Sequence, residues 1–346
     1  MSQVGIEQLP IDYVEVPASM PPQLFVVVDT EEEFDWSAPF SRDNTSVSAM
    51  RHIHRLQSIL DRHRIRPTYV IDYAVSHQRD GYAPLKEIAD SGRCRIGAHL
   101  HPWVTPPHAE EINRRHSFAC TLGTLEAEKI RILRDDIADR FGKVPATYKA
   151  GRYGFGPSTA EALEALGFDI DLSVNPRNDY TNEGGPSFVG FDTTPFFFGR
   201  RRRLLELPCS TDFSGALAGS LGPVLHRAAS TPALRRLHAV GVMARLHVVN
   251  KTMLSPEGHS LAEMQALTRS LLARGVRTFA MTLHSPSVQP GCTPYVRTER
   301  DLQEFLARID AFCGFFLGEV GGASTTPEDL YGLLSKNVSA LEERAS

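Results

Sequence analysis

Histidines and carboxylates stand at several points where an apolar stretch of the chain ends. His99 and His101 are two residues apart at the end of one such stretch, and Asp29 and Glu31 are two apart at the end of the most apolar one, 23–29. Residues two apart in an extended chain point to the same side, so each pair can face a single ion. Two imidazoles and one carboxylate leave an open position on a divalent ion, which is the arrangement of hydrolytic zinc sites.

Three more residues at the ends of apolar stretches could complete a hydrolytic site. Lys149 lies near the end of a fourth stretch with Arg152 just after it, and His284 ends the last one. A second carboxylate near the ion can act as general base, a further histidine can be the general acid, and a basic residue can keep the base ionised. By contrast, Glu32 and Glu33 are predicted to form a solvated acidic turn, because charged side chains are seldom buried.

The sequence lacks the signatures of other common catalytic sites. It contains no phosphate-binding glycine loop, no Gly-x-Ser-x-Gly elbow and only a wrongly spaced glycine pattern at 151–156. Five scattered cysteines fit neither a disulfide framework nor a thiolate zinc site, which indicates a reducing setting. The net charge of −4 gives no reason to expect nucleic acid as a partner, and the basic run Arg200–Arg203 is interpreted as a solvated loop.

The chain shows no sign of export or of a membrane span. Its first residues lack the basic start and the apolar stretch of a signal peptide, and no window reaches the roughly 18 apolar residues that a span needs. We therefore expect a cytoplasmic protein. Nothing in the sequence indicates an oligomeric state.

A parallel α/β scaffold would bring the candidate residues together. Seven short β-type runs occur, at 23–29, 67–72, 94–99, 146–151, 168–173, 203–208 and 277–284. Segments with helical periodicity lie between or after them, at 47–63, 121–142, 157–167, 259–275 and 329–344. This alternation predicts a parallel sheet covered by helices, either closed as a barrel or open. In both cases the carboxyl ends of the strands share one face, where such folds build their active sites.

The length of 346 residues fits one α/β barrel with extensions. We expect an N-terminal extension over 1–21, the barrel over 22–317 and a peripheral C-terminal helix over 318–346. The stretch 174–203 is rich in proline, glycine, asparagine and aromatic residues, which predicts a long irregular insertion.

Five motifs occur in an order that resembles the polysaccharide deacetylase superfamily, the NodB-homology carbohydrate esterases: VVVDTEEEFDW, RPTYVID, RIGAHLHPW, YKAGRYGFG and TLHSPSVQPGCTPYV. The resemblance covers roughly residues 22–300 and is closest to the WalW-like branch, which is associated with lipopolysaccharide biosynthesis. It implies a distorted (β/α) barrel with about seven parallel strands that holds a divalent metal, usually zinc. It also implies removal of an N- or O-acetyl group from a sugar or glycan precursor.

The resemblance also implies roles for the candidate residues. The metal ligands would be Glu31, His99 and His101. Asp29 would be the general base and His284 the general acid of the leaving group. Lys149 stands where the family commonly has the arginine that orients the base, with Arg152 as the alternative. Aromatic residues that could stack on sugar rings are Trp103, Tyr153, Tyr295 and Phe196–Phe198, although as a group they could equally pack in the core.

The motifs depart from the usual family pattern at three points. The ligand histidines of the family are usually separated by three residues, and Trp103 occupies the equivalent position here. An Asp-Thr-Glu sequence replaces the adjacent aspartate pair, and Lys149 lacks the planar fork of an arginine. Two other functions therefore stay open: hydrolysis of another non-peptide C–N bond, such as a cyclic amide, and glycan binding by a catalytically inactive homologue.

Overall fold

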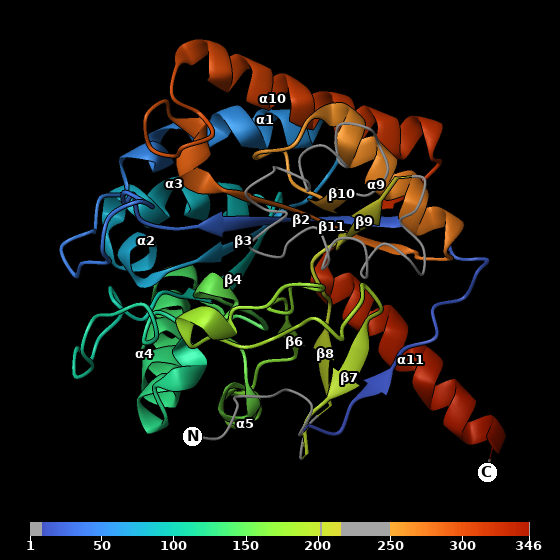
Figure 1. Cartoon of the computed structure of the whole chain (residues 1–346), viewed down its shortest axis with the longest axis horizontal. Coiled ribbons are helices and arrows are strands. Elements are labelled where there is room, and N and C mark those ends of the chain that lie inside the picture. Colours follow the sequence, from blue (N-terminus) through green and yellow to red (C-terminus); the bar gives the residue numbers. More distant parts are fainter. Residues whose placement is uncertain (1–8, 201–202, 216–249, 346) are drawn as a thin grey trace, which may run out of the picture.

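The computed structural model describes residues 9–200, 203–215 and 250–345, which form a large sheet covered by helices (Figure 1). Arg201 and Arg202 of the predicted solvated loop lie outside the described residues, as do residues 1–8 of the predicted N-terminal extension.

Seven of the described strands are parallel to one another, in the spatial order β8, β6, β5, β4, β3, β2, β11. Their bounds are β2 Gln23–Thr30, β3 Thr68–Ile71, β4 Arg95–Leu100, β5 Thr147–Ala150, β6 Ile170–Asp171, β8 Leu204–Glu206 and β11 Thr278–His284. Each of the seven predicted β-type runs overlaps one of these strands, so the predicted parallel sheet is confirmed.

The sheet is a distorted, incompletely closed (β/α) barrel. Leu254 links the segment that follows β8 to β11: its N–H donates to the carbonyl of Ser210, and its carbonyl accepts from the N–H of Thr282. Shorter strands flank the parallel set: β1 Asp12–Tyr13, β7 Phe196–Phe198, β9 Thr211–Ser214, β10 Asn250–Met253 and β12 Ala323–Ser324. β7 runs antiparallel to β8, and β9 and β10 form a separate antiparallel ribbon.

Helices cover the outer face of the sheet, with α1 beside α10 on one side and α4 beside α5 on another (Figure 1). Their bounds are α1 His54–Arg62, α2 Tyr73–His77, α3 Arg79–Asp90, α4 Thr124–Phe141, α5 Pro157–Leu166, α9 Leu261–Ala273, α10 Glu299–Gly314 and α11 Pro327–Ala345. Short 3₁₀ or π turns lie at η2 Ser48–His52, η3 Ala119–Thr121, η4 Gly151–Tyr153, η5 Thr181–Glu183, η6 Ser285–Val288 and η7 Phe315–Glu319. Local sequence fixes several helix starts, since Ser260 with Glu263 and Thr298 with Asp301 form capping boxes.

Both faces of the barrel wall are apolar, which explains why β2 is an unbroken apolar run. Leu24, Val26 and Val28 pack outward under the helices, while Phe25 and Val27 point inward. The inner cluster also receives apolar side chains from four other parallel strands and from α11: Val70, Ile170, Leu205, Ala280, Leu330 and Leu334. α11 therefore closes the end of the barrel at which the strands begin.

Two sequence expectations can be checked directly against this packing. Phe196–Phe198 are buried in the apolar core, so they are not available to stack on a sugar. In its described residues, the stretch 174–203 is mostly irregular and holds β7 and the short turn η5, as predicted. No helix in the described part of the chain is long and apolar enough to cross a bilayer.

Candidate active site

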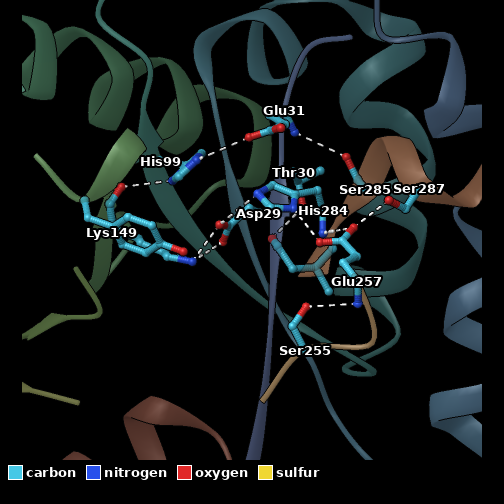
Figure 2. A network of polar contacts seen from close by, with 12 residues as sticks. Asp29, Thr30, Glu31, His99, Lys149, Ser255, Glu257, His284, Ser285 and Ser287 are labelled. Atoms are coloured by element: carbon cyan, nitrogen blue, oxygen red, sulfur yellow. Dashed lines mark hydrogen bonds and ion pairs between the residues drawn. The ribbon is translucent and has the colours of Figure 1, made fainter. Parts of the chain in front are cut away.

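Ionisable side chains from four parallel strands meet at the carboxyl ends of those strands (Figure 2). The alternation of β2 puts Asp29 on the same inner face as Val27. The register sets His284 of β11 beside Asp29, and Lys149 of β5 beside His99 of β4. A cavity of about 350 Å³ opens here, and its lining includes nine of the ten candidate residues: Asp29, Glu31, His99, His101, Lys149, Arg152, Tyr153, His284 and Tyr295.

Glu31, His99 and His101 form a compact, buried set of ligand atoms. The Oε2 atom of Glu31 lies 3.6 Å from Nε2 of His99 and 3.4 Å from Nε2 of His101. The other carboxylate oxygen of Glu31 is buried and has no hydrogen-bond partner among the residues that the structure describes. One oxygen and two imidazole nitrogens, with all ligand atoms within 4.8 Å of one another, fit a divalent cation.

The outer nitrogens of both histidines are occupied by the protein. Nδ1 of His99 is 3.1 Å from the carbonyl oxygen of Lys149, and Nδ1 of His101 is 2.8 Å from a carboxylate oxygen of Glu32. With the protons on Nδ1, the lone pairs of both Nε2 atoms face Glu31. Burial lowers the pKa of His101, which keeps this ring neutral and able to bind a cation.

The prediction that Glu32 lies in a solvated turn was wrong, because this side chain is completely buried. It accepts hydrogen bonds from His101 and from the indole N–H of Trp103, at 2.8 and 2.7 Å. Burial raises the pKa of Glu32 to about 7, and burial together with the nearby Glu32 charge raises the pKa of Asp72 well above its usual range. Glu32 orients His101 through Nδ1, and Asp72 accepts hydrogen bonds from the backbone N–H groups of Glu32 and Val75.

Trp103, which the sequence suggested as a sugar contact, is buried behind the cavity. Its ring is only 2% exposed and lies outside the lining of the cavity. It stacks on His101 and on Phe40, with ring centroids 4.3 Å apart in both pairs. Two residues beyond His101, the chain therefore has an indole that supports the ring of His101.

Asp29 is paired with Lys149 in the interior of the barrel. The ammonium nitrogen of Lys149 lies 2.7 and 2.6 Å from the two carboxylate oxygens. Burial alone would raise the pKa of Asp29, but the charges of Lys149, His99 and His284 hold it below its usual value. Asp29 is therefore ionised at neutral pH and can accept a proton.

The Lys149→Met variant is expected to lose about 3–5 kcal/mol of unfolding free energy, because a buried carboxylate is left without its partner. Without the ammonium group, burial dominates and the pKa of Asp29 rises. The difference in unfolding free energy between the wild type and Lys149→Met should therefore shrink as the pH falls and Asp29 takes up a proton. Urea denaturation at several pH values measures this, with Lys86→Met, which removes a partly exposed ion pair on α3, as the control. A loss of unfolding free energy that does not change with pH would contradict the role of Lys149 in keeping Asp29 ionised.

His284 is held by a carboxylate that the sequence did not reveal. Its Nδ1 lies 2.6 Å from Oε2 of Glu257, and its Nε2 points toward Asp29 at 3.8 Å (Figure 2). Burial alone would lower the pKa of His284, but the charges of Glu257, Glu31 and Asp29 raise it to about 10. His284 is therefore protonated at neutral pH and can give a proton to a leaving group.

The Glu257→Gln variant is expected to lower the pKa of His284 and to shift the basic limb of the pH–rate profile downward by about 1–3 pH units. A general acid acts only while it is protonated, so activity is lost as the pH rises through its pKa. Ser287→Ala is the matched control, since it removes one hydrogen bond to Glu257 but keeps the charge. Identical basic limbs in the wild type and Glu257→Gln would show that His284 is not the proton donor.

Arg152 lines the cavity but does not contact Asp29, so it is not the alternative orienting residue. Its Nη1 donates to Oγ of Ser117 at 2.7 Å, and its Nη2 pairs with Glu183. Just before it, Gly151 lies so close to His101 that an added Cβ would be 2.3 Å from the imidazole Cδ2. Only glycine fits at this position.

Tyr153 and Tyr295 line the cavity, together with Trp36 and Tyr180, which the sequence reasoning missed. The ring of Trp36 packs edge to face against the rings of His284 and Tyr295, with centroid distances of 4.9 and 5.5 Å. Tyr153 stacks on Tyr180 at 5.6 Å, and the Lys149 ammonium group lies over the Tyr153 ring at 5.6 Å. Aromatic surface is therefore available beside the proton donor.

No family model matches the chain, and no curated protein matches it. Among solved structures, it is similar to a Mycobacterium smegmatis protein assigned to the polysaccharide deacetylases, with 15% identity, a TM-score of 0.49 and coverage of 97% of this chain and 96% of that one. The chain is also similar to the peptidoglycan deacetylase PdaC from Bacillus subtilis, with 11% identity, a TM-score of 0.43 and coverage of 95% of this chain and 98% of that one. A third similar structure is a CE4 family pseudoenzyme from Bacillus anthracis, with 9% identity, a TM-score of 0.44 and coverage of 95% of this chain and 70% of that one.

Proposed function

We propose that this chain is a metal-dependent hydrolase that removes an acetyl group from a sugar or a polysaccharide precursor. One observation carries the proposal: a buried ligand set of Glu31, His99 and His101 shares a cavity with an ionised Asp29 and a protonated His284. A base and an acid beside a cation site match the needs of acyl transfer to water.

Each residue has a separate task in the proposed reaction. Bound by Glu31, His99 and His101, a divalent cation, which we propose to be zinc, would polarise the acyl carbonyl and lower the pKa of water. Asp29 takes the proton of the attacking water, and Lys149 keeps Asp29 ionised and in place. His284, oriented by Glu257, then gives its proton to the nitrogen or oxygen of the sugar as acetate leaves.

We propose the biological setting and the domain limits from the sequence. We propose that the substrate belongs to surface-glycan or lipopolysaccharide biosynthesis, since the motifs resemble those of the WalW-like branch. We also propose a cytoplasmic location, which agrees with five cysteines that are all unpaired. The barrel domain would span 22–317, with an extension before it and the C-terminal helix after it.

Elemental analysis of the purified protein, followed by acetate assays, tests this function. We expect about one divalent ion per chain, acetate release from N- or O-acetylated sugars, loss of release after chelation and recovery with zinc. A set of cyclic amides is assayed in parallel. Ring opening of an amide without acetate release would favour the other C–N hydrolase, and a metal-free protein that binds glycan would favour an inactive homologue.

A further inference from the structure

Two arginines form one wall of the cavity, and the proposed deacetylation uses neither of them. We propose that the substrate carries an anionic group, a carboxylate or a phosphate, in addition to its acyl group, and that Arg114 and Arg152 bind this group. The inference rests on the proposed function and adds the chemical class of the substrate to it.

Arg152 is fixed in place before any substrate arrives. Its guanidinium group lies over the ring of Phe118 at 4.5 Å and near Phe40 at 5.4 Å. Hydrogen bonds to Ser117, to Glu183 and to the carbonyl oxygen of Arg114 engage at most three of its five N–H donors. A planar cation held this way can offer its remaining donors to an oxyanion at little cost in side-chain entropy.

The backbone at this point is strained. Arg152 has a φ of 49° and Tyr153 a φ of 61°, so two consecutive residues other than glycine adopt the left-handed conformation. Such residues cost of order 1–3 kcal/mol each and cluster at ligand-binding sites. Both side chains line the cavity, and the strain therefore falls on the residues that shape it.

The charges of this wall are not balanced internally. Asp29 is matched by Lys149, and His284 by Glu257. Arg114 and Arg152, in contrast, share one carboxylate among the described residues, that of Glu183, which does not line the cavity. Within the part of the chain that the structure describes, one positive charge is therefore left over on this wall.

Arg114 is the more accessible partner of this pair. Its side chain is 60% exposed, and its Nη1 lies 3.6 Å from Glu183, so it can turn toward a ligand. Two guanidinium groups side by side suit carboxylate and phosphate oxygens, to which arginine can bind with two parallel hydrogen bonds. A neutral sugar alone would leave the excess charge of this wall without a partner.

Calorimetric titration of the metal-loaded Asp29→Asn variant tests this inference without relying on turnover. The probes are N-acetylglucosamine, N-acetylmuramic acid, which adds a carboxylate, and N-acetylglucosamine 1-phosphate. At low salt, at least one anionic sugar should bind roughly tenfold more tightly than the neutral one. Which of the two binds more tightly separates a carboxylate from a phosphate substrate.

Variants and controls then locate the effect. Adding Arg114→Ala or Arg152→Gln should abolish the preference for the anionic sugar, while Arg300→Ala, which removes an exposed arginine on α10, should keep it. Equal binding of all three sugars, or a preference that survives both cavity variants, would overturn the inference. Wild-type acetate release is measured separately: anionic preference without acetate release would contradict the proposed function alone, and release from neutral sugars without any preference would contradict only this inference.

Discussion

The His99→Ala variant is expected to lose both bound metal and acetate release. Only Glu31 and His101 of the buried ligand set would remain, and one carboxylate with one imidazole is a poor site for zinc. Loss of an outer-shell partner alone typically lowers metal affinity about 10–100-fold, so loss of a direct ligand should cost more. Elemental analysis after gel filtration and an acetate assay at saturating substrate measure the two effects.

His77→Ala is the matched control for this variant, because His77 is an exposed histidine at the end of α2. Circular dichroism should show that both variants remain folded. Wild-type metal content in His99→Ala would rule out the ligand set, and wild-type acetate release would rule out the proposed role of the site in catalysis.

The Asp29→Asn variant should keep its metal but lose acetate release by a factor of about 10²–10⁴, the usual contribution of a general base. Asparagine has nearly the same shape, so the cavity should persist, but it cannot take a proton from water. Metal content and kcat are measured on the same sample. Asp35→Asn, a change of the same kind at an exposed aspartate nearby, should leave both unchanged.

This variant also separates two roles for Asp29. If Asp29→Asn loses its metal as completely as His99→Ala does, Asp29 is a ligand and not the base. The distances favour the base, since both carboxylate oxygens are within 2.7 Å of Lys149, whereas the oxygen of Glu31 faces the two histidines.

Strand positions and the meeting of the candidate residues could be predicted from sequence. Each strand is a short apolar run, and parallel strands all end on the same side of the sheet. Asp29, Lys149, His99 and His284 occupy neighbouring positions at these ends, so a correct strand assignment is enough to bring them together.

The groups that orient these residues could not be predicted in the same way. Glu32 lies beyond the last residue of β2, where strand alternation no longer says which way a side chain points. Glu257 sits in a loop between β10 and α9, and nothing nearby in sequence marks it as the partner of His284. Arg114 reaches the cavity from an irregular segment. Contacts of this kind depend on how distant loops pack, which no local pattern records.

The pairing register has a consequence for how such a protein can vary. His284 stands opposite Asp29, and Lys149 opposite His99, so the ladder of main-chain hydrogen bonds aligns the reacting groups. Deleting one residue inside β2 would turn Asp29 to the outer face, whereas loops of different length can be exchanged above an unchanged ladder. Natural variation in length should therefore accumulate in the loops around the mouth of the cavity, where it would alter what binds while preserving the reaction.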